Sequence, residues 1–188
     1  MTVSFRKPLS SSAKRKILAI WLIGGILATM VTIVSFGIAG FRVNLTPSEP
    51  IGLWRIISLD RAVRNGDLIF ACPPDTDVMR EAHARGYLRH GLCAGGLAPL
   101  IKTVAAMPGQ VVAIGDEVHI DGRPLPNSQL ALKDAHGRPI VPHRGGIVAP
   151  SDVYLHSNFP GSFDSRYFGP LPIENVLGLA EEVWTFAP

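Results

Sequence analysis

A serine between two prolines is the first group in this sequence that could do chemistry. Ser48 lies in Thr46-Pro47-Ser48-Glu49-Pro50, where each proline fixes its own φ and biases the residue before it away from helix. We therefore expect Ser48 in a short, stiff, extended piece that holds its hydroxyl at a fixed point. Proline-rich linkers have the same composition, so a linker is the alternative.

Lys102 is the second candidate, because it interrupts the apolar run Leu100–Ala106. In a strand Leu100, Lys102 and Val104 share one face, and both faces of this run are apolar. Burial disfavours an ammonium and lowers its pKa, and the neutral amine can then take the proton from a serine hydroxyl. The alternative is a lysine whose stem packs while its ammonium reaches water.

Metal chemistry has no support in the sequence, and we expect neither a metal nor a cofactor. The two cysteines match no zinc-binding spacing. The six histidines show no H-E-x-x-H spacing. We interpret them as loop or surface residues: His83, His90, His119, His136, His143 and His156.

The N-terminal part predicts a membrane anchor. Ile17 to Phe41 holds no charge, and its 25 residues would span roughly 37 Å as a helix, enough to cross a hydrocarbon core of about 30 Å with some tilt. The rival is a cleavable signal peptide, for which Gly37-Ile38-Ala39 resembles a cleavage site. The run is longer than the ~7–15 apolar residues of a signal peptide, which favours an uncleaved anchor.

Charge sets the expected orientation. Five basic residues precede the apolar run and a single one, Arg42, follows it closely, which places the N-terminus in the cytoplasm. We therefore expect a basic cytoplasmic tail (1–16), an anchor (17–41) in the inner membrane and a periplasmic domain (42–188). That domain carries 13 basic and 15 acidic residues. It has no basic excess, which argues against a nucleic-acid partner.

Both cysteines, Cys72 and Cys93, lie in the domain predicted to be outside the cytoplasm. An even count in an oxidising compartment favours a disulfide, which would stabilise the domain by about 3 kcal/mol. Two unpaired buried thiols are the alternative.

Short apolar runs between turn signals predict a mainly β domain. One short helix is expected at 76–88, where Thr76 or Asp75 would cap its start. The segment 124–150 is rich in Pro, Gly and His and is interpreted as a long loop. The expected strands are 51–58, 68–71, 100–106, 110–114, 117–120, 152–156 and 177–184.

Three segments, taken in order, resemble the type I signal peptidase superfamily, and most closely its TraF branch of conjugative transfer. Thr46–Arg55 resembles the nucleophile segment, Pro99–Gly109 the general-base segment, and Asp164–Pro170 the D-S-R-Y-[FW]-G-P segment. Cys72–Pro74 and Leu92–Gly96 also look typical of that branch. The resemblance implies an antiparallel β catalytic domain behind a single transmembrane helix.

It also implies a role for each matching residue. Ser48 would be the nucleophile and Lys102 the general base of a Ser/Lys dyad, and the Thr46 hydroxyl would be an oxyanion donor beside the Ser48 N–H. Ser162 would orient the lysine amine, against the alternative of an ordinary loop serine. Asp164 would pair with Arg166 as structural support, or act directly on the base; the sequence leaves both open.

Two positions depart from the family pattern. Glu49 follows the nucleophile where an apolar residue is usual, so its carboxylate would favour a charged lysine or contact a basic substrate residue. His156-Ser157-Asn158 replaces the glycine-aspartate pair of general signal peptidases.

The resemblance implies a membrane-anchored serine endopeptidase that cuts a precursor pilin, or another exported polypeptide, beside the membrane lipid. Its partners would belong to a conjugation or type IV secretion system, and some members of the branch make a cyclic pilin. One alternative is a general leader peptidase of the same chemistry. The other is a non-catalytic periplasmic scaffold of a secretion channel.

Overall fold

The computed structural model describes residues 11–186 of the chain. It divides into two units, the first ending at Phe41 and the second beginning at Arg42. The predicted basic tail falls partly outside the described residues, because Arg6 and Lys7 precede residue 11. Lys14, Arg15 and Lys16 lie in the first turns of a helix.

The first unit is built on helix α1, Ser11–Ile38. Its part from Lys14 to Ile38 is long and apolar enough to cross a membrane, with a mean hydropathy of 2.5. The hydroxyls of Thr29 and Thr32 donate to carbonyls four residues earlier, each at 2.9 Å, so neither polar group is left unpaired in an apolar setting. The helix is compatible with a single-pass anchor, and it ends three residues before the predicted Phe41.

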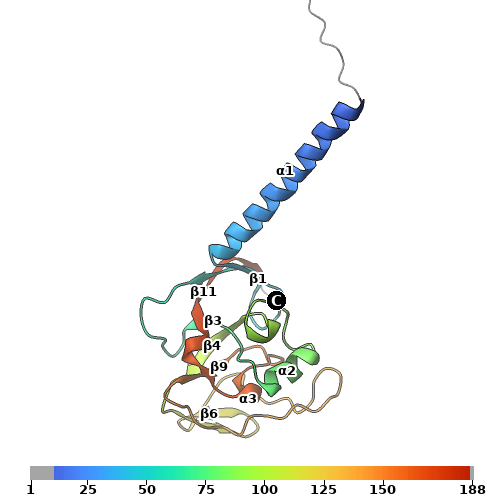
Figure 1. The fold of residues 1–188 in the computed structure, drawn as a ribbon. Helices are drawn as coiled ribbons and strands as arrows, with labels where there is room; N and C mark the ends of the chain where they lie inside the picture. The colour runs from blue at the N-terminus through green and yellow to red at the C-terminus, as the bar shows by residue number, and fades with distance from the viewer. Residues whose placement is uncertain (1–10, 187–188) are drawn as a thin grey trace, which may run out of the picture. The chain divides into compact units, whose positions relative to one another are not determined.

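The second unit is a mainly β domain with two antiparallel sheets (Figure 1). The larger sheet has the order β1-β2-β11-β3-β4-β9-β10 and the smaller one β7-β6-β5-β8. The larger comprises β1 Phe41–Asn44, β2 Ile51–Ile57, β3 Leu68–Ala71, β4 Leu100–Ala106, β9 Asp152–His156, β10 Leu171–Pro172 and β11 Val176–Phe186. The smaller comprises β5 Val111–Ile114, β6 Val118–Ile120, β7 Arg123–Pro124 and β8 Gly146–Ile147.

The predicted fold class is confirmed. Strands β3 and β4 have the predicted bounds, and the predicted small helix is α2, Asp77–Ala84. Thr76 caps it, because its side chain accepts from the N–H of Met79. A further helical turn, α3 Ser165–Phe168, was not predicted and is begun by Asp164 as N-cap. Two short 3₁₀ turns occur at Ala94–Gly96 and Ile173–Asn175.

Two glycines let β11 lie close to β2. Gly52 has φ +147°, and a Cβ there would lie 2.2 Å from the carbonyl oxygen of Trp184. Gly178 has φ +153°, and its Cβ would lie 2.3 Å from the Ile57 oxygen. The β11 register shifts near both contacts, between 182 and 184 and between 176 and 178. A side chain at either position would force these strands apart.

Strand β4 is surrounded by packed side chains. Val104 belongs to one cluster with Ile69 and Leu155, and Ile101 to a second with Trp54 and Phe70. A third cluster joins the end of β4 to the smaller sheet through Ala105, Ala106, Val112, Val118 and Tyr154. Residues on β4 are therefore held on a rigid central strand.

The 124–150 segment, predicted as a loop, is mostly without regular structure apart from Pro124 of β7 and strand β8. It is tied to the region after α2. Asp134 accepts from Arg138 Nε at 2.5 Å and from the Tyr87 hydroxyl at 2.7 Å, and Arg85 donates to the Pro139 carbonyl at 2.7 Å. Figure 1 shows this segment passing close to α2 and α3.

Candidate active site

The segment that carries Ser48 is folded around the side chain of Asn44. The Asn44 Nδ2 group lies 2.8–3.0 Å from the carbonyls of Thr46, Glu49 and Pro50. Its Oδ1 accepts from the N–H and the hydroxyl of Thr46, at 3.0 and 2.7 Å. The buried Trp54 indole also donates to the Pro50 carbonyl, at 2.9 Å. Six hydrogen bonds thus fix a segment of five residues.

The predicted extended conformation of Ser48 is wrong. Pro47 and Ser48 form a turn between β1 and β2. Proline is favoured in turns because its fixed φ suits the second turn position, and the Asn44 side chain pulls three carbonyls of the segment toward one point. The turn still holds the half-buried Ser48 residue at a fixed place, as a nucleophile requires.

Lys102 lies on β4 between β3 and β9, opposite Ile69. It is 3% exposed, and its Nζ donates to the Ile101 carbonyl at 3.0 Å. Burial lowers its pKa from 10.5 to about 8, although the Asp164 and Glu49 carboxylates act to raise it. The neutral amine is therefore accessible close to neutral pH.

Ser157 joins the two segments. Thr103 pairs with His156 in the β4–β9 register, so the next residues along, Lys102 and Ser157, face each other across the strands. The Ser157 hydroxyl donates to the Ser48 carbonyl, and its N–H donates to Asp164 Oδ2 at 3.2 Å. Ser48 and Lys102 are 54 positions apart in the sequence. The fold thus brings the Ser48 turn next to the strand position of Lys102.

Glu49 lies in the same neighbourhood. Burial raises the pKa of its carboxyl, while the positive charge of Lys102 acts to lower it. The Lys102 amine therefore has two carboxylates near it, Glu49 and Asp164. Of the two predicted effects of Glu49, support for a charged lysine fits this position.

Asp164 and Arg166 form the predicted pair, fully buried. Arg166 Nε and Nη2 donate to the two carboxylate oxygens at 2.8 and 2.9 Å, a bidentate arrangement. Burial acts to raise the pKa of Asp164, but His156, whose Nδ1 lies 3.4 Å from Oδ2, and the hydrogen bonds from Arg166 outweigh it, and that pKa is lowered. Asp164 is a carboxylate that supports the site electrostatically through its effect on Lys102.

The hydroxyls of Thr46 and Ser162 do not make the contacts predicted for them. The Thr46 hydroxyl lies 3.4 Å from Ser48 Oγ but donates to Asn44 Oδ1, so it must turn before it can serve an oxyanion. Ser162 Oγ is buried and, among the described residues, has no hydrogen-bond partner, Lys102 included. Both assignments stay predictions.

Cys72 and Cys93 form the predicted disulfide, and no described cysteine is free. It closes the segment that contains α2, whose apolar side packs through Met79 and Ala82 against Leu88 and Leu97. Among the described residues no group of three or more His, Cys, Asp or Glu side chains could hold a metal ion.

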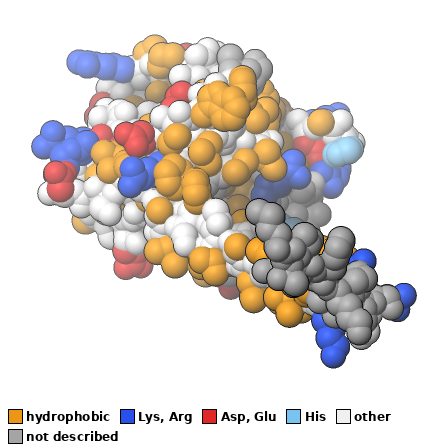
Figure 2. Space-filling view, turned by 90° about the horizontal axis from the view of Figure 1, so that it is seen from above, with side chains coloured by type: hydrophobic (Ala, Val, Ile, Leu, Met, Phe, Trp, Pro, Cys, Tyr) orange, Lys and Arg blue, Asp and Glu red, His pale blue; other side chains and the backbone are white. Residues whose placement is uncertain are grey.

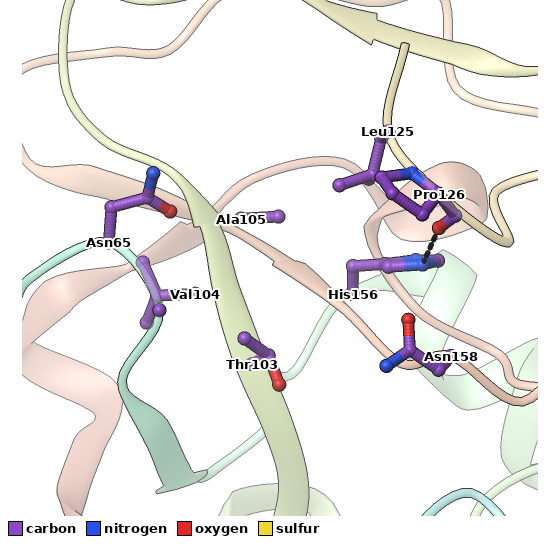
Figure 3. Close-up of a pocket in the computed structure, with 9 residues that line it drawn as sticks. Asn65, Thr103, Val104, Ala105, Leu125, Pro126, His156 and Asn158 are labelled. Carbon is purple, nitrogen blue, oxygen red and sulfur yellow. Dashed lines mark hydrogen bonds between the residues drawn. The ribbon is translucent and has the colours of Figure 1, made fainter.

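The prediction that all six histidines are loop or surface residues is wrong for His156, which is buried on β9. It lines a hollow of about 230 Å³ whose other polar residues are Asn65, Thr103 and Asn158. Figure 3 shows Leu125 and Pro126 on the side of the hollow opposite Asn65, with the imidazole reaching the Pro126 carbonyl. Single-residue patterns could not reveal this histidine, because its position depends on the β4–β9 register.

Sequence reasoning also missed Asn44 and gave Ser157 no role. A signal for Asn44 was present, since asparagine just before a proline-rich turn commonly bonds to the backbone that follows it. Ser157 gave no such signal, because its contacts are with residues 109 positions and seven positions away.

Comparisons with known proteins show which family the chain resembles. The family described as "Signal peptidase, peptidase S26" matches residues 15–185. A probable conjugal transfer protein TraF of Sinorhizobium fredii is 58% identical over 162 residues, 86% of each chain. The conjugal transfer protein TraF of Agrobacterium fabrum is 49% identical over 176 residues, which cover 94% of this chain and 99% of the relative.

Two relatives of lower identity also match the chain. A plasmid transfer protein TraF of Escherichia coli is 35% identical over 176 residues, or 92% of this chain and 97% of the relative. A probable signal peptidase I-2 of Synechocystis is 31% identical over 83 residues, 43% of this chain and 35% of the relative. The chain belongs to the signal peptidase family S26, as a member of its TraF type.

Proposed function

We propose that the chain is a membrane-anchored serine endopeptidase that processes a precursor pilin in a conjugative transfer system. Ser48 is the nucleophile and Lys102 is the general base. The observation that carries the proposal is the buried Lys102 amine, with its pKa lowered to about 8, on the strand position facing Ser157, which holds the Ser48 turn. The TraF relatives, named for conjugal and plasmid transfer, support the biological setting.

The first chemical step transfers one proton and forms one bond. Neutral Lys102 Nζ takes the Ser48 hydroxyl proton while Ser48 Oγ attacks the substrate carbonyl carbon, whose oxygen becomes negative. The Ser48 N–H and the Thr46 hydroxyl, once released from Asn44, donate to that oxygen. One such donor lowers the barrier by roughly 3–4 kcal/mol.

The second step breaks the peptide bond. The Lys102 ammonium gives its proton to the leaving amine, and an acyl-enzyme on Ser48 remains. Water or an amine of the substrate then attacks the acyl carbon and passes a proton to Lys102. The bond between the acyl carbon and Ser48 Oγ breaks, and the Lys102 ammonium returns that proton to Ser48 Oγ, which restores the enzyme. Attack by water gives a cut polypeptide, and attack by an amine of the same polypeptide gives a cyclic product.

The Lys102 amine is oriented by its surroundings. One of its hydrogens goes to the Ile101 carbonyl at 3.0 Å, so the neutral amine is held while its lone pair stays available. Asp164 and Glu49 stabilise the ammonium that forms in the first step. Burial and the two carboxylates act in opposite directions, which sets the pKa near the value a general base needs at neutral pH.

We place the anchor in the inner membrane, the N-terminus in the cytoplasm and the catalytic domain in the periplasm. The apolar α1 and the basic residues at its start support this placement. The disulfide supports it too, since disulfides persist in oxidising compartments. Apolar side chains gather on the face seen in Figure 2, and the domain exposes Trp184 and Phe186, aromatic residues suited to a lipid interface.

The test uses the full chain with its precursor pilin and follows the mass of the pilin. Ser48→Ala and Lys102→Ala should each abolish processing. The matched controls are Ser151→Ala and Lys133→Ala, which alter exposed residues outside the site and should process normally. Normal processing by both site variants would refute the enzyme and favour the scaffold alternative. Processing of bulk exported precursors at the same rate would favour a general leader peptidase.

A further inference from the structure

Ser157 lies between the two segments that the proposed reaction must bring together. We propose that Ser157 is a positioning residue, whose hydroxyl holds the main chain of Ser48 next to the strand position of Lys102. This role rests on the peptidase function proposed above. It adds a residue that acts through the main chain of the nucleophile and not on the reacting atoms themselves.

The strand register sets the direction of the Ser157 side chain. Thr103 pairs with His156, and both line the same hollow, so their side chains point to one face of the sheet (Figure 3). Side chains alternate between the two faces along a strand, so the next residues in the register, Lys102 and Ser157, point to the opposite face. Ser157 therefore lies on the face of the general base, across from it.

The hydrogen bonds of the Ser157 hydroxyl have a fixed direction. The carbonyl oxygen of Ser48 can only accept, so the hydroxyl donates its single hydrogen to that oxygen. The hydroxyl oxygen in turn accepts from the N–H of Phe159 at 3.3 Å. Because Ser157 is only 1% exposed, bulk water competes weakly for either bond. The donor is thus aimed at Ser48 before any substrate binds.

Ser157 supplies a contact that Asn44 does not make. The Asn44 Nδ2 group lies 2.8–3.0 Å from three carbonyl oxygens of the turn, whereas the carbonyl of Ser48 is bonded to Ser157. Asn44 therefore fixes the shape of the turn, and Ser157 fixes where the turn lies against the end of β9. With its carbonyl held, Ser48 can move its Oγ atom mainly by rotation about χ1.

The main chain of Ser157 is itself held in place. Its N–H donates to Asp164 Oδ2 at 3.2 Å, and the buried Arg166 binds both oxygens of that carboxylate. The N–H belongs to the main chain, so it stays whatever side chain stands at position 157. A substitution there removes the contact with Ser48 and leaves the bond to Asp164 in place.

Two pairs of proteins isolate the hydroxyl. Wild type and Ser157→Ala differ by one oxygen, and Ser157→Thr and Ser157→Val have nearly the same shape but differ in the hydroxyl. The matched control is Ser128→Ala. Ser128 is also fully buried, and its hydroxyl donates to the Leu125 carbonyl at 2.6 Å and accepts from the Val118 N–H at 2.9 Å. This control loses the same kinds of bond at a place that does not touch Ser48.

The assay is acylation of the full chain by a p-nitrophenyl ester in detergent micelles, at the pH of the wild-type maximum. We expect the maximal rate of Ser157→Ala to fall on the order of 30-fold with KM unchanged, because a slightly displaced nucleophile reacts poorly with a substrate that still binds. Ser157→Thr should react roughly ten-fold faster than Ser157→Val. Ser128→Ala should react at the wild-type rate.

Hydrogen exchange followed by mass spectrometry gives a readout that does not depend on catalysis. In Ser157→Ala the peptide that carries residues 44–50 should exchange faster than in wild type, because the turn has lost its tether. Peptides from β4 and β9 should exchange as in wild type. Faster exchange throughout the domain would show a general loss of stability and would overturn the proposal.

Three kinetic results would also overturn it: wild-type acylation by Ser157→Ala, equal rates for the Thr and Val variants, or an equal loss in Ser128→Ala. These results are distinct from a failure of the proposed function. If Ser48 is acylated in wild type and equally fast in Ser157→Ala, the nucleophile assignment stands and the positioning role fails. If no protein forms an adduct on Ser48, the peptidase function fails, and the exchange measurement alone decides whether Ser157 holds the turn.

Discussion

Replacing Lys102 by methionine should remove activity and stabilise the domain. Methionine has a similar length, no charge and good packing in an apolar setting. The protein holds the Lys102 amine at a pKa of about 8 instead of 10.5, which means that folding disfavours the ammonium. At about 1.4 kcal/mol per pKa unit, the difference corresponds to roughly 3 kcal/mol of stability lost when the amine is charged.

The sign of the pH dependence follows from the direction of this change. Because the folded pKa lies below the unfolded value, the unfolded chain binds the proton more tightly, and the full penalty applies below pH 8. It shrinks as pH rises from about 8 to 10.5 and is nearly gone above that value. The advantage of Lys102→Met over wild type should therefore fall by roughly 3 kcal/mol between pH 7 and 10.5.

The assay is guanidinium unfolding of the full chain in micelles at several pH values, followed by tryptophan fluorescence. Taking the difference between variant and wild type cancels the other titrating groups. Lys133→Met is the matched control, since Lys133 is the other lysine of the domain and is exposed. A Lys102→Met variant whose advantage stays constant with pH, or that is less stable at pH 7 by several kcal/mol, would refute a low amine pKa.

Three further predictions concern the supports of the site. Reducing the disulfide, or replacing Cys72 and Cys93 by serine, should lower the free energy of unfolding by about 3 kcal/mol, measured by denaturant unfolding with and without a phosphine reductant. Asn44→Ala should leave the fold intact, as seen by circular dichroism, but slow ester acylation of Ser48 on the order of 100-fold, because it removes five of the hydrogen bonds that shape the turn. Thr46→Val should slow acylation by about 100-fold and Thr46→Ser much less; equal rates in all three proteins would exclude an oxyanion role for this hydroxyl.

Sequence patterns predicted secondary structure correctly where it depends on neighbouring residues alone. The apolar runs at β3 and β4 lie between clear turn signals, so their bounds were predicted correctly. Thr76 indicates the start of α2, because a threonine just before a helical pattern can accept a hydrogen bond from an N–H group of the first helical turn.

Sequence patterns failed where the local structure depends on side chains or strands that lie elsewhere in the sequence. Strand β1 and α3 are four residues long and, unlike the apolar β3 of the same length, are not continuous apolar runs. The turn at Ser48 depends on the Asn44 side chain, whose donors and acceptors override the extended bias of the prolines. His156 is buried because β9 pairs with β4, and a single sequence does not show which strands pair.

The central claim is that the Lys102 amine becomes neutral near pH 8 and activates Ser48. The most direct measurement is the rate of Ser48 acylation by a p-nitrophenyl ester against pH, with the adduct located by mass spectrometry. The rate should rise with pH to half its maximum near pH 8, should vanish in Ser48→Ala and Lys102→Met, and should be unchanged in Lys133→Met. An acid limb near 10.5, or acylation that persists in Lys102→Met, would contradict the account.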